Sequence, residues 1–350
     1  MPLDSAFIST LNAQLNSPFD AIGVAAIDEI GINDIKDDSD ILSEIFNFHS
    51  IQDEIDYLKE WLKSGYAGEM RYMHNNLHLR ANPKELLPEA KSMIMVLMNY
   101  YPREWQPKDK PQIAAYAYGN DYHHIVKSKL TELSEEINKV APHKYAVFCD
   151  SAPVLERYWA ARAGLGWIGK NGMLVNPKLG TFTFIGTLIT SLELEPSEVM
   201  ENRCGTCRKC IDACPTGAIL NNPLPLRGLP LKQRENMNAQ QHTLKNNLNY
   251  TIDARKCLSY QTIEKRGEVD NELIEVAGNT LYGCDRCQLA CPWNRFAHPH
   301  KHPELEPIEG IFEIDWASMS RSEFNRKLKF SPMQRAGLKK IKARYMQIKN

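Results

Sequence analysis

The sequence has no hydrophobic run long enough to cross a membrane and no export signal at its start. The longest apolar stretch runs from Ser92 to Tyr101, whereas a membrane-spanning helix needs ~20 apolar residues. Residues 1–5 contain neither the basic region nor the apolar core of a secretory signal. We therefore expect a cytoplasmic protein with no membrane partner, and we expect it to be a monomer.

A net charge is almost absent, with 42 basic and 43 acidic residues and a formal charge of −1. This balance does not favour nucleic-acid binding by the chain as a whole. The average conceals an asymmetry. Residues 1–60 hold 2 basic and 13 acidic residues, whereas residues 321–350 hold 10 basic and 1 acidic residue. The basic C-terminal segment predicts either contact with phosphates or a solvated helix face.

Nucleotide-binding motifs are also missing. No GxGxxG follows an expected strand, so a dinucleotide-binding fold has no support. The glycine-rich segment 164–172 follows an expected helix and lacks the spacing of a phosphate-binding loop. Such a segment can bring the backbone close to a large flat or phosphate-bearing ligand, or it can form successive turns. Both interpretations remain open.

Hydrophobic periodicity predicts alternating strands and helices in the first half of the chain. Apolar runs at 21–27, 93–100, 145–149 and 181–194 indicate strands, and helical spacing marks 51–62, 125–137 and 153–163. This pattern predicts an α+β fold whose first part, residues 1–195, is an α/β-type layer domain. A ferredoxin-like part is expected at 196–300, with a polar insertion at 221–250. The basic helical tail, 301–350, is expected to pack on the core.

Cysteines are the most specific feature of the sequence. One run has the spacing C-x2-C-x2-C-x3-C and is followed by Pro215. It matches the bacterial ferredoxin run, in which the fourth cysteine ligates the other of two clusters. A second set repeats this run, with 26 residues between its first two cysteines, and is followed by Pro292. This crossover predicts one 4Fe–4S cluster on Cys204, Cys207, Cys210 and Cys291, and a second on Cys214, Cys257, Cys284 and Cys287.

Other uses of these cysteines fit less well. Disulfides require an oxidising compartment, and zinc sites do not account for two CxxxCP endings. A radical enzyme using S-adenosylmethionine would need a cysteine where Gly217 stands. The ninth cysteine, Cys149, is expected to be a buried small side chain.

The long N-terminal part predicts a second redox centre or a substrate site, because an electron carrier alone needs no domain of that size. Asp150 ends an expected strand and precedes a proline-containing helix start. Its apolar neighbours would raise the pKa of this carboxyl and suit it to proton donation. Aspartate is also a favoured helix N-cap, which gives an alternative structural role.

Several longer motifs resemble the epoxyqueuosine reductase family. They include Gly119-Asn-Asp-Tyr-His123, Asp150-Ser-Ala-Pro-Val154 and the segment 163–172. Gly283-Cys-Asp-Arg-Cys-Gln288, Ala290-Cys-Pro-Trp-Asn294 and the segment 331–337 follow in the family's order. Together these motifs span nearly the whole chain.

The resemblance implies reduction of epoxyqueuosine to queuosine at the wobble position of a tRNA anticodon, with the epoxide oxygen leaving as water. It implies cobalamin, two 4Fe–4S clusters, and a low-potential reductant such as a flavodoxin or ferredoxin. Asp150 matches the family's proton donor. The Asp-x-His-x-x-Gly motif that supplies a cobalt ligand in some cobalamin enzymes is broken at Val126, as the family would imply.

The resemblance also gives expectations for individual contacts. The residues expected near cobalamin are Tyr116, Asp121, His123, Gly166, Lys170 and Asn171. The residues expected to contact tRNA are Arg335, Lys339, Lys340, Lys342 and Arg344. Two alternatives remain: a reductive dehalogenase-like enzyme acting on a small organohalide, and an electron carrier without a substrate. Cobalt content distinguishes the second alternative from an enzyme.

Overall fold

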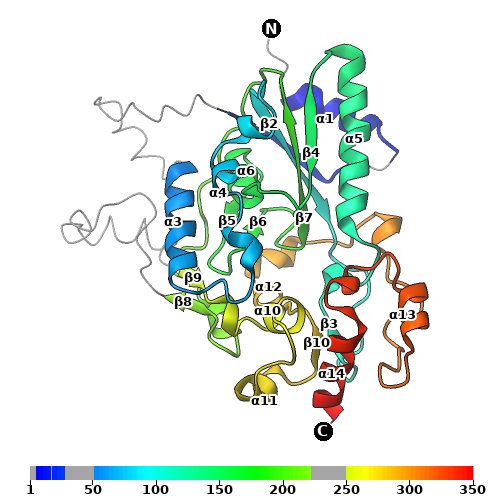
Figure 1. The fold of residues 1–350 in the computed structure, drawn as a ribbon. Coiled ribbons are helices and arrows are strands. Elements are labelled where there is room, and N and C mark those ends of the chain that lie inside the picture. The colour runs from blue at the N-terminus through cyan, green and yellow to red at the C-terminus, as the bar shows by residue number, and fades with distance from the viewer. Residues whose placement is uncertain (1–4, 17, 28–50, 222–249, 350) are drawn as a thin grey trace, which may run out of the picture.

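The computed structural model describes residues 5–16, 18–27, 51–221 and 250–349. Its centre is a four-stranded sheet in the order β1-β2-β7-β4, in which every neighbouring pair is antiparallel. The strands are β1 (Ala21–Ala26), β2 (Ser92–Asn99), β4 (Tyr145–Phe148) and β7 (Thr183–Thr190). Figure 1 shows this sheet in the upper half of the molecule. Helices cover both of its faces, so the architecture is α+β.

The alternating side chains of β2 show why the sheet lies between two layers. All eight residues of this strand are buried. Ile94, Val96 and Met98 belong to one hydrophobic cluster, whereas Met93, Met95 and Leu97 belong to another. Successive side chains of a strand point to opposite faces. A continuous apolar run therefore identifies a strand that is covered on both sides.

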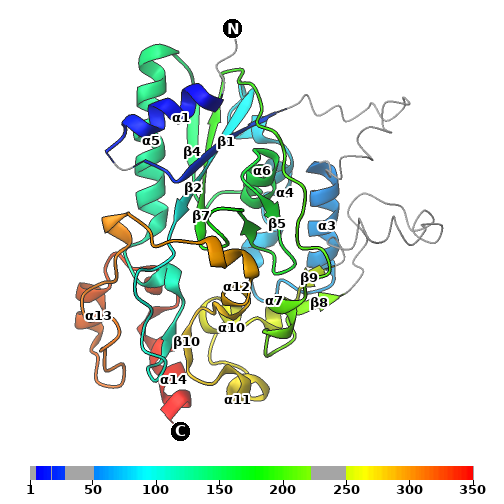
Figure 2. The ribbon, with the colours of Figure 1, turned by 180° about the vertical axis from the view of Figure 1, so that it is seen from behind.

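Helices α1 (Ser5–Gln14) and α5 (Tyr122–Val140) cover one face, and α3 (Ile51–Lys63), α4 (Leu77–Ala81) and α6 (Glu156–Arg162) lie on the other side (Figure 2). Helix α5 begins where the Asp121 side chain accepts the backbone N–H of His123. Val126, Leu130 and Leu133 then recur at helical spacing and are fully buried.

The helix predicted at 153–163 is shorter than expected and begins at Glu156. Its N-cap position is Leu155, so the alternative role of Asp150 as a helix cap is wrong. Pro153 disfavours the helical conformation of the residue before it, and residues 150–155 form an irregular loop instead.

The cysteine-bearing part lies below the sheet and consists of short pieces (Figure 1). Its helices are α7 (Lys209–Asp212), α10 (Leu258–Ile263), α11 (Ile274–Ala277) and α12 (Arg286–Leu289). Strands β8 (Ile219–Asn221) and β9 (Tyr250–Ile252) pair with each other. Strand β10 (Thr280–Tyr282) pairs in parallel with β3 (Gln112–Ile113) and thereby joins this part to the N-terminal layers. Residues 222–249 of the predicted polar insertion lie outside the described residues.

The C-terminal segment contains α13 (Arg321–Lys327) and α14 (Gly337–Lys349). A capping box between Ser320 and Glu323 starts α13. Helix α14 packs beside β10, as Figure 1 shows. Strands β5 (Trp167–Ile168) and β6 (Leu174–Val175) form a small hairpin. Among the described helices, none is both long and apolar enough to span a bilayer.

Candidate active site

Asp150 lies on a loop directly after β4, in an unusual backbone conformation. Its φ of +58° is in the left-handed region, which aspartate and asparagine tolerate better than most residues. Its backbone N–H donates to both carboxylate oxygens of Glu156, each at 3.0 Å. The first residue of α6 therefore fixes the loop, and the Asp150 side chain remains 63% exposed.

Two donors converge on one oxygen of Asp150. The Tyr122 hydroxyl donates to Oδ2 at 2.7 Å, and Nε2 of His123 lies 3.3 Å from the same atom. The other ring nitrogen of His123, Nδ1, is 2.6 Å from Oδ1 of Asp121. The imidazole thus bridges two carboxylates, Asp121 and Asp150. Tyr122 and His123 are the first two residues of α5, and Asp121 is its N-cap residue.

This arrangement shifts the proton from the carboxyl to the imidazole. Burial opposes charge on both groups, but the hydrogen bonds from His123 and Tyr122 hold the pKa of Asp150 below its usual range. Desolvation lowers the pKa of His123, yet its hydrogen bonds to Asp121 and Asp150 prevail and raise it to about 9. The expectation of a raised pKa for Asp150 is therefore wrong. Its apolar sequence neighbours do not reveal the two donors on α5.

Aromatic rings pack against Tyr122, one of the two donors to Asp150. The ring of Tyr122 stacks on Phe184 of β7, with centroids 4.0 Å apart and planes at 5°. Tyr116 lies edge-on to Tyr122, with centroids 6.2 Å apart, and 6.1 Å from Tyr282 of β10. Tyr116, Asp121 and His123, which we expected together near a cofactor, are thus brought to one place beside Asp150.

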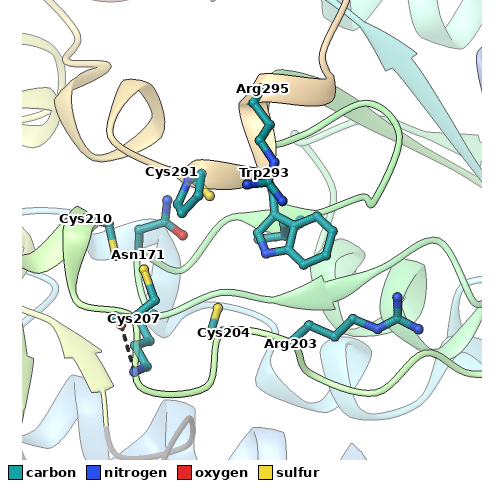
Figure 3. A pocket seen from close by; sticks show the side chains of 11 residues that line it. Asn171, Arg203, Cys204, Cys207, Cys210, Cys291, Trp293 and Arg295 are labelled. Atoms are coloured by element: carbon teal, nitrogen blue, oxygen red, sulfur yellow. Dashed lines mark hydrogen bonds between the residues drawn. The ribbon is translucent and has the colours of Figure 1, made fainter.

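The first group of cysteines lines one cavity of about 170 Å³ (Figure 3). Cys204 and Cys207 come from the loop leading into α7, Cys210 lies in α7 itself, and Cys291 comes from the segment after α12. Trp293 and three cations, Lys170, Arg203 and Arg295, also line it. The structure therefore brings together the four cysteines of the crossover prediction.

The second group is more deeply enclosed and adjoins the first. Burial raises the pKa of the Cys287 thiol, as do the neighbouring Cys284 and Cys257 and, from the first group, Cys210. Burial raises the pKa of the Cys257 thiol, and the neighbouring Cys214 raises it further. Two such groups side by side are what the exchange of the fourth cysteine between two ferredoxin runs produces.

Asp285, which lies between Cys284 and Cys287, links the second cysteine group to the segment that carries Tyr116. Its Oδ2 accepts the backbone N–H of Ala115 at 2.7 Å, and its Oδ1 accepts from Gln288 at 3.2 Å. Burial raises the pKa of this carboxyl to about 6. Asp285 was not singled out in the sequence, although it lies between two motif cysteines.

The glycine-rich segment contacts the cysteine loops. Lys170 is 5% exposed, and its ammonium donates to the carbonyls of Gly205 and Cys207 at 2.7 and 2.9 Å. The Asn171 amide lies 3.5 Å from the carbonyl of Cys287. At Gly166 a Cβ would lie 2.1 Å from the carbonyl of Val175, so the β5–β6 hairpin itself requires glycine there. The structure does not bring these three residues together with Asp150.

The basic tail is not a uniform surface. Arg335 pairs with Glu264 at 2.7 and 3.0 Å, and Lys339 is exposed. Burial lowers the pKa of Lys340, which donates to the carbonyl of Lys265, to about 8. Lys342 donates to the carbonyl of Ala317.

Arg344 is the exception among the tail cations. It is 2% exposed and donates to the carbonyls of Thr280 and Gly278 at 2.8 and 2.6 Å. The expectation that Arg344 contacts tRNA is therefore wrong. Its guanidinium satisfies backbone carbonyls beside β10, which a count of basic residues cannot distinguish from a surface charge.

Comparison with known proteins decides the family. The epoxyqueuosine reductase of Cellulophaga algicola is 39% identical over 300 residues, which cover 83% of this chain and 88% of that protein. The chain belongs to the epoxyqueuosine reductase family. The Escherichia coli member is 35% identical over 291 residues, covering 80% and 69% of the two chains. It follows that the chain is an oxidoreductase, as the motifs indicated.

Family models and solved structures agree with this assignment. The model described as epoxyqueuosine reductase QueG, DUF1730, matches residues 80–151. A 4Fe-4S double cluster binding domain matches 241–294, and a 4Fe-4S binding domain matches 197–220. Iron–sulfur binding and the predicted fold class are thereby confirmed.

Two solved structures of family members each match 98% of this chain and 79% of their own. One is an epoxyqueuosine reductase with an epoxyqueuosine-modified tRNA-Tyr stem loop, with a TM-score of 0.68 and 27% identity. The other is from Bacillus subtilis, with a TM-score of 0.71 and 25% identity, and has its aspartate-bearing catalytic loop swung out of the active site.

Proposed function

We propose that this protein reduces epoxyqueuosine in the anticodon loop of tRNA to queuosine, with Asp150 delivering the proton that releases the epoxide oxygen. The reaction consumes two electrons and two protons, and it yields an alkene and water. The observation that carries the proposal is the convergence of His123 and Tyr122 on the exposed carboxylate of Asp150. Family membership supports the reaction class.

The residues present fit the two kinds of cofactor that the family implies. Each cysteine group provides the four thiols that a 4Fe–4S cluster requires. Both ring nitrogens of His123 are engaged by carboxylates, so the residues around Asp150 fit a cobalamin whose cobalt takes no histidine from the protein. When bound, cobalamin would supply two-electron chemistry at the epoxide carbon, and the clusters would supply single electrons. Tyr116, Asp121 and His123 are the proposed neighbours of cobalamin. Gly166, Lys170 and Asn171 are also proposed, although Gly166 packs within the β5–β6 hairpin and the contacts of Lys170 and Asn171 lie with the cysteine loops.

The chain's own residues account for the proton supply. At neutral pH the proton resides on His123, whose pKa is raised to about 9. Asp150 accepts it through the Nε2–Oδ2 contact and presents it to the substrate oxygen from its exposed side. Asp121 holds Nδ1 and thereby keeps Nε2 pointing at Asp150. His123 is thus the proton store, and Asp150 is the group that touches the substrate.

The reductant reaches the first cysteine group, because this group lies nearer the surface. A second cavity beside Cys291 is lined by Lys209 and Arg295 together with Leu289, which is 54% exposed. Two cations and an exposed leucine match an acidic electron-transfer protein such as a flavodoxin or ferredoxin. We propose that this electron donor reduces the enzyme in the cytoplasm and that the enzyme is a monomer.

RNA contacts are proposed for the basic residues that remain accessible. These are Arg335, Lys339, Lys340 and Lys342, on η9 (Pro332–Arg335) and α14. A family member holds a modified stem loop in a crystal, which supports the same class of substrate here. The proposed parts of the chain are 1–195 for catalysis, 196–300 for the clusters, and 301–350 for packing and RNA contact.

The function is tested with purified protein prepared anaerobically with iron, sulfide and cobalamin. An epoxyqueuosine-modified stem loop and a chemical reductant are added, and nucleosides are analysed by mass spectrometry. We expect queuosine to form. Unchanged epoxyqueuosine, with both clusters and cobalamin present and reduced, would reject the function. A preparation that binds iron but no cobalamin would favour an electron carrier.

A further inference from the structure

An exposed aromatic side chain interacts electrostatically with the proposed acid. Tyr72, on η1 (Arg71–His74), is 44% exposed. Burial and the negative charge of Glu264 raise the pKa of its phenol to about 12. Arg335 and Asp150 also interact electrostatically with this hydroxyl. The hydroxyl is thus neutral, and a large ring is left facing solvent where the substrate must approach.

Arg335 is held over this ring. Its guanidinium carbon lies 5.6 Å from the ring centroid of Tyr72, while its Nε and Nη2 atoms donate to the two oxygens of Glu264. A planar pair of this kind offers a cation and a π-face together. Its orientation is fixed before any ligand arrives, because Glu264 is bound in a bidentate manner.

A second arginine, Arg80, interacts electrostatically with Tyr72. Burial lowers the pKa of Arg80, while Tyr72 and Glu156 act on it electrostatically. Its Nε–H is enclosed and has no hydrogen-bond partner in the described part of the chain. An enclosed donor without an acceptor is costly.

We propose that Tyr72 is a stacking platform for an unpaired base of the tRNA anticodon loop, flanked by Arg335 and Arg80. Single-stranded RNA is recognised by stacking of splayed bases on aromatic rings and guanidinium planes. The platform would hold a neighbour of the modified nucleotide while that nucleotide reaches Asp150. This inference rests on the proposed function, because it assumes an RNA substrate.

Binding of an unmodified anticodon stem loop tests the platform without any turnover. We expect Tyr72→Ala to raise the Kd by about 5- to 100-fold, which is the usual effect of losing one stacked base. Tyr72→Phe keeps the ring and should stay within about 3-fold of the parent protein. Phe296→Ala is the matched control: that ring is 48% exposed and has Arg295 over it at 4.6 Å, but it adjoins Trp293.

Salt dependence and abasic substitutions separate stacking from charge. Arg335→Gln should reduce the slope of log Kd against log salt by about one ion, whereas Tyr72→Ala should leave the slope unchanged. When single loop nucleotides are made abasic, one position should show no further loss in Tyr72→Ala. Additive losses at every loop position would overturn the platform.

The outcomes also distinguish the two proposals. If the parent protein binds the stem loop and Tyr72→Ala binds equally well, only the platform is wrong. If Tyr72→Phe binds as poorly as Tyr72→Ala, the hydroxyl matters and stacking is rejected. If the parent protein shows no RNA binding, the proposed tRNA substrate itself fails. Thermal unfolding of each variant checks that the fold is intact.

Discussion

Glu156 receives the backbone N–H of Asp150 on both of its carboxylate oxygens, each at 3.0 Å. This contact ties the first residue of α6 to a residue in the left-handed conformation six positions earlier. Burial and the charge of Asp150 raise the pKa of Glu156 to about 8, so this carboxyl is mostly protonated at neutral pH. Its effect is positional: it holds the loop that presents the proposed acid.

Substitution of Glu156 tests this positional effect. Glu156→Gln keeps an oxygen acceptor without charge and should retain turnover within about 3-fold, whereas Glu156→Ala should lower kcat by roughly 100-fold, because a displacement of about 1 Å can have that effect. Hydrogen exchange of residues 149–155 should increase only in the alanine variant. Equal activity of both variants would show that the contact does not position Asp150.

Removal of the proposed acid gives a direct prediction. Asp150→Asn preserves the shape and the tolerance of a positive φ, but it cannot deliver a proton. We expect kcat for the modified stem loop to fall by about 10²–10⁴-fold. Iron content, cobalamin content and stem-loop affinity should stay unchanged. Turnover close to that of the parent protein would remove Asp150 from the mechanism.

The pH dependence should reflect His123. The pKa of this imidazole is raised from 6.5 to about 9, so turnover should fall as pH rises through about 9, where the stored proton is lost. Asp121→Asn removes one anionic partner and should move this limb lower by roughly one pH unit. An unshifted limb in the variant would assign the proton store to another group.

The free energy of unfolding should also depend on the ionisation of His123, and it should fall as the pH rises. Because the folded pKa exceeds the unfolded value, the stabilisation from ionised His123 is fully present below about 6.5 and disappears between 6.5 and 9. Urea unfolding at several pH values should therefore show a decline across this window. The decline should be smaller in His123→Gln.

Lys170 places a buried cation against the first cysteine loop, through the carbonyls of Gly205 and Cys207. A cation beside a 4Fe–4S cluster favours its reduced state. Lys170→Met should therefore make the reduction potential of one cluster more negative, and Lys170→Arg should largely restore it. A redox titration followed by electron paramagnetic resonance measures both. An unchanged potential would limit Lys170 to a structural role.

Arg344 should contribute mainly to stability. Arg344→Met leaves the carbonyls of Thr280 and Gly278 without their donor, and it should lower the free energy of unfolding by about 2–4 kcal/mol. Lys349→Met, an exposed change on the same helix, should stay within about 0.5 kcal/mol. Chemical unfolding compares the two. If Arg344→Met instead weakened RNA binding at unchanged stability, our correction would itself be wrong.

Local patterns were sufficient for the cysteines and for most regular elements. The spacing around Cys204 and Cys284 reflects the geometry of a cluster, which acts over a few residues and so appears directly in the sequence. The apolar run at 93–100 likewise predicted a strand, and the structure shows that β2 is buried along its whole length. Strand order was less accessible. The pattern of apolar runs does not show that β4 pairs antiparallel with β7, the strand that follows it by 35 residues.

Long-range contacts explain what the sequence did not predict. The proton balance of Asp150 depends on Tyr122, which is 28 residues away along the chain. The role of Arg344 depends on carbonyls 64 and 66 residues earlier. Lys170 meets the loop of Cys207 only because the β5–β6 hairpin packs there. Residue type and spacing contain no information about these partners.

The position of Arg344 has a consequence for the order in which the protein matures. The ribosome synthesises Gly278, Thr280 and the three cysteines that follow before it reaches Arg344, whose side chain bonds the carbonyls of Gly278 and Thr280. Cys284 and Cys287 follow β10 directly, and α14 packs beside that strand. A nascent chain stalled before residue 337 is therefore expected to retain little iron, although all eight motif cysteines have already been made. Iron measured on such stalled chains, compared with released protein, would show whether cluster insertion is a late step of biogenesis.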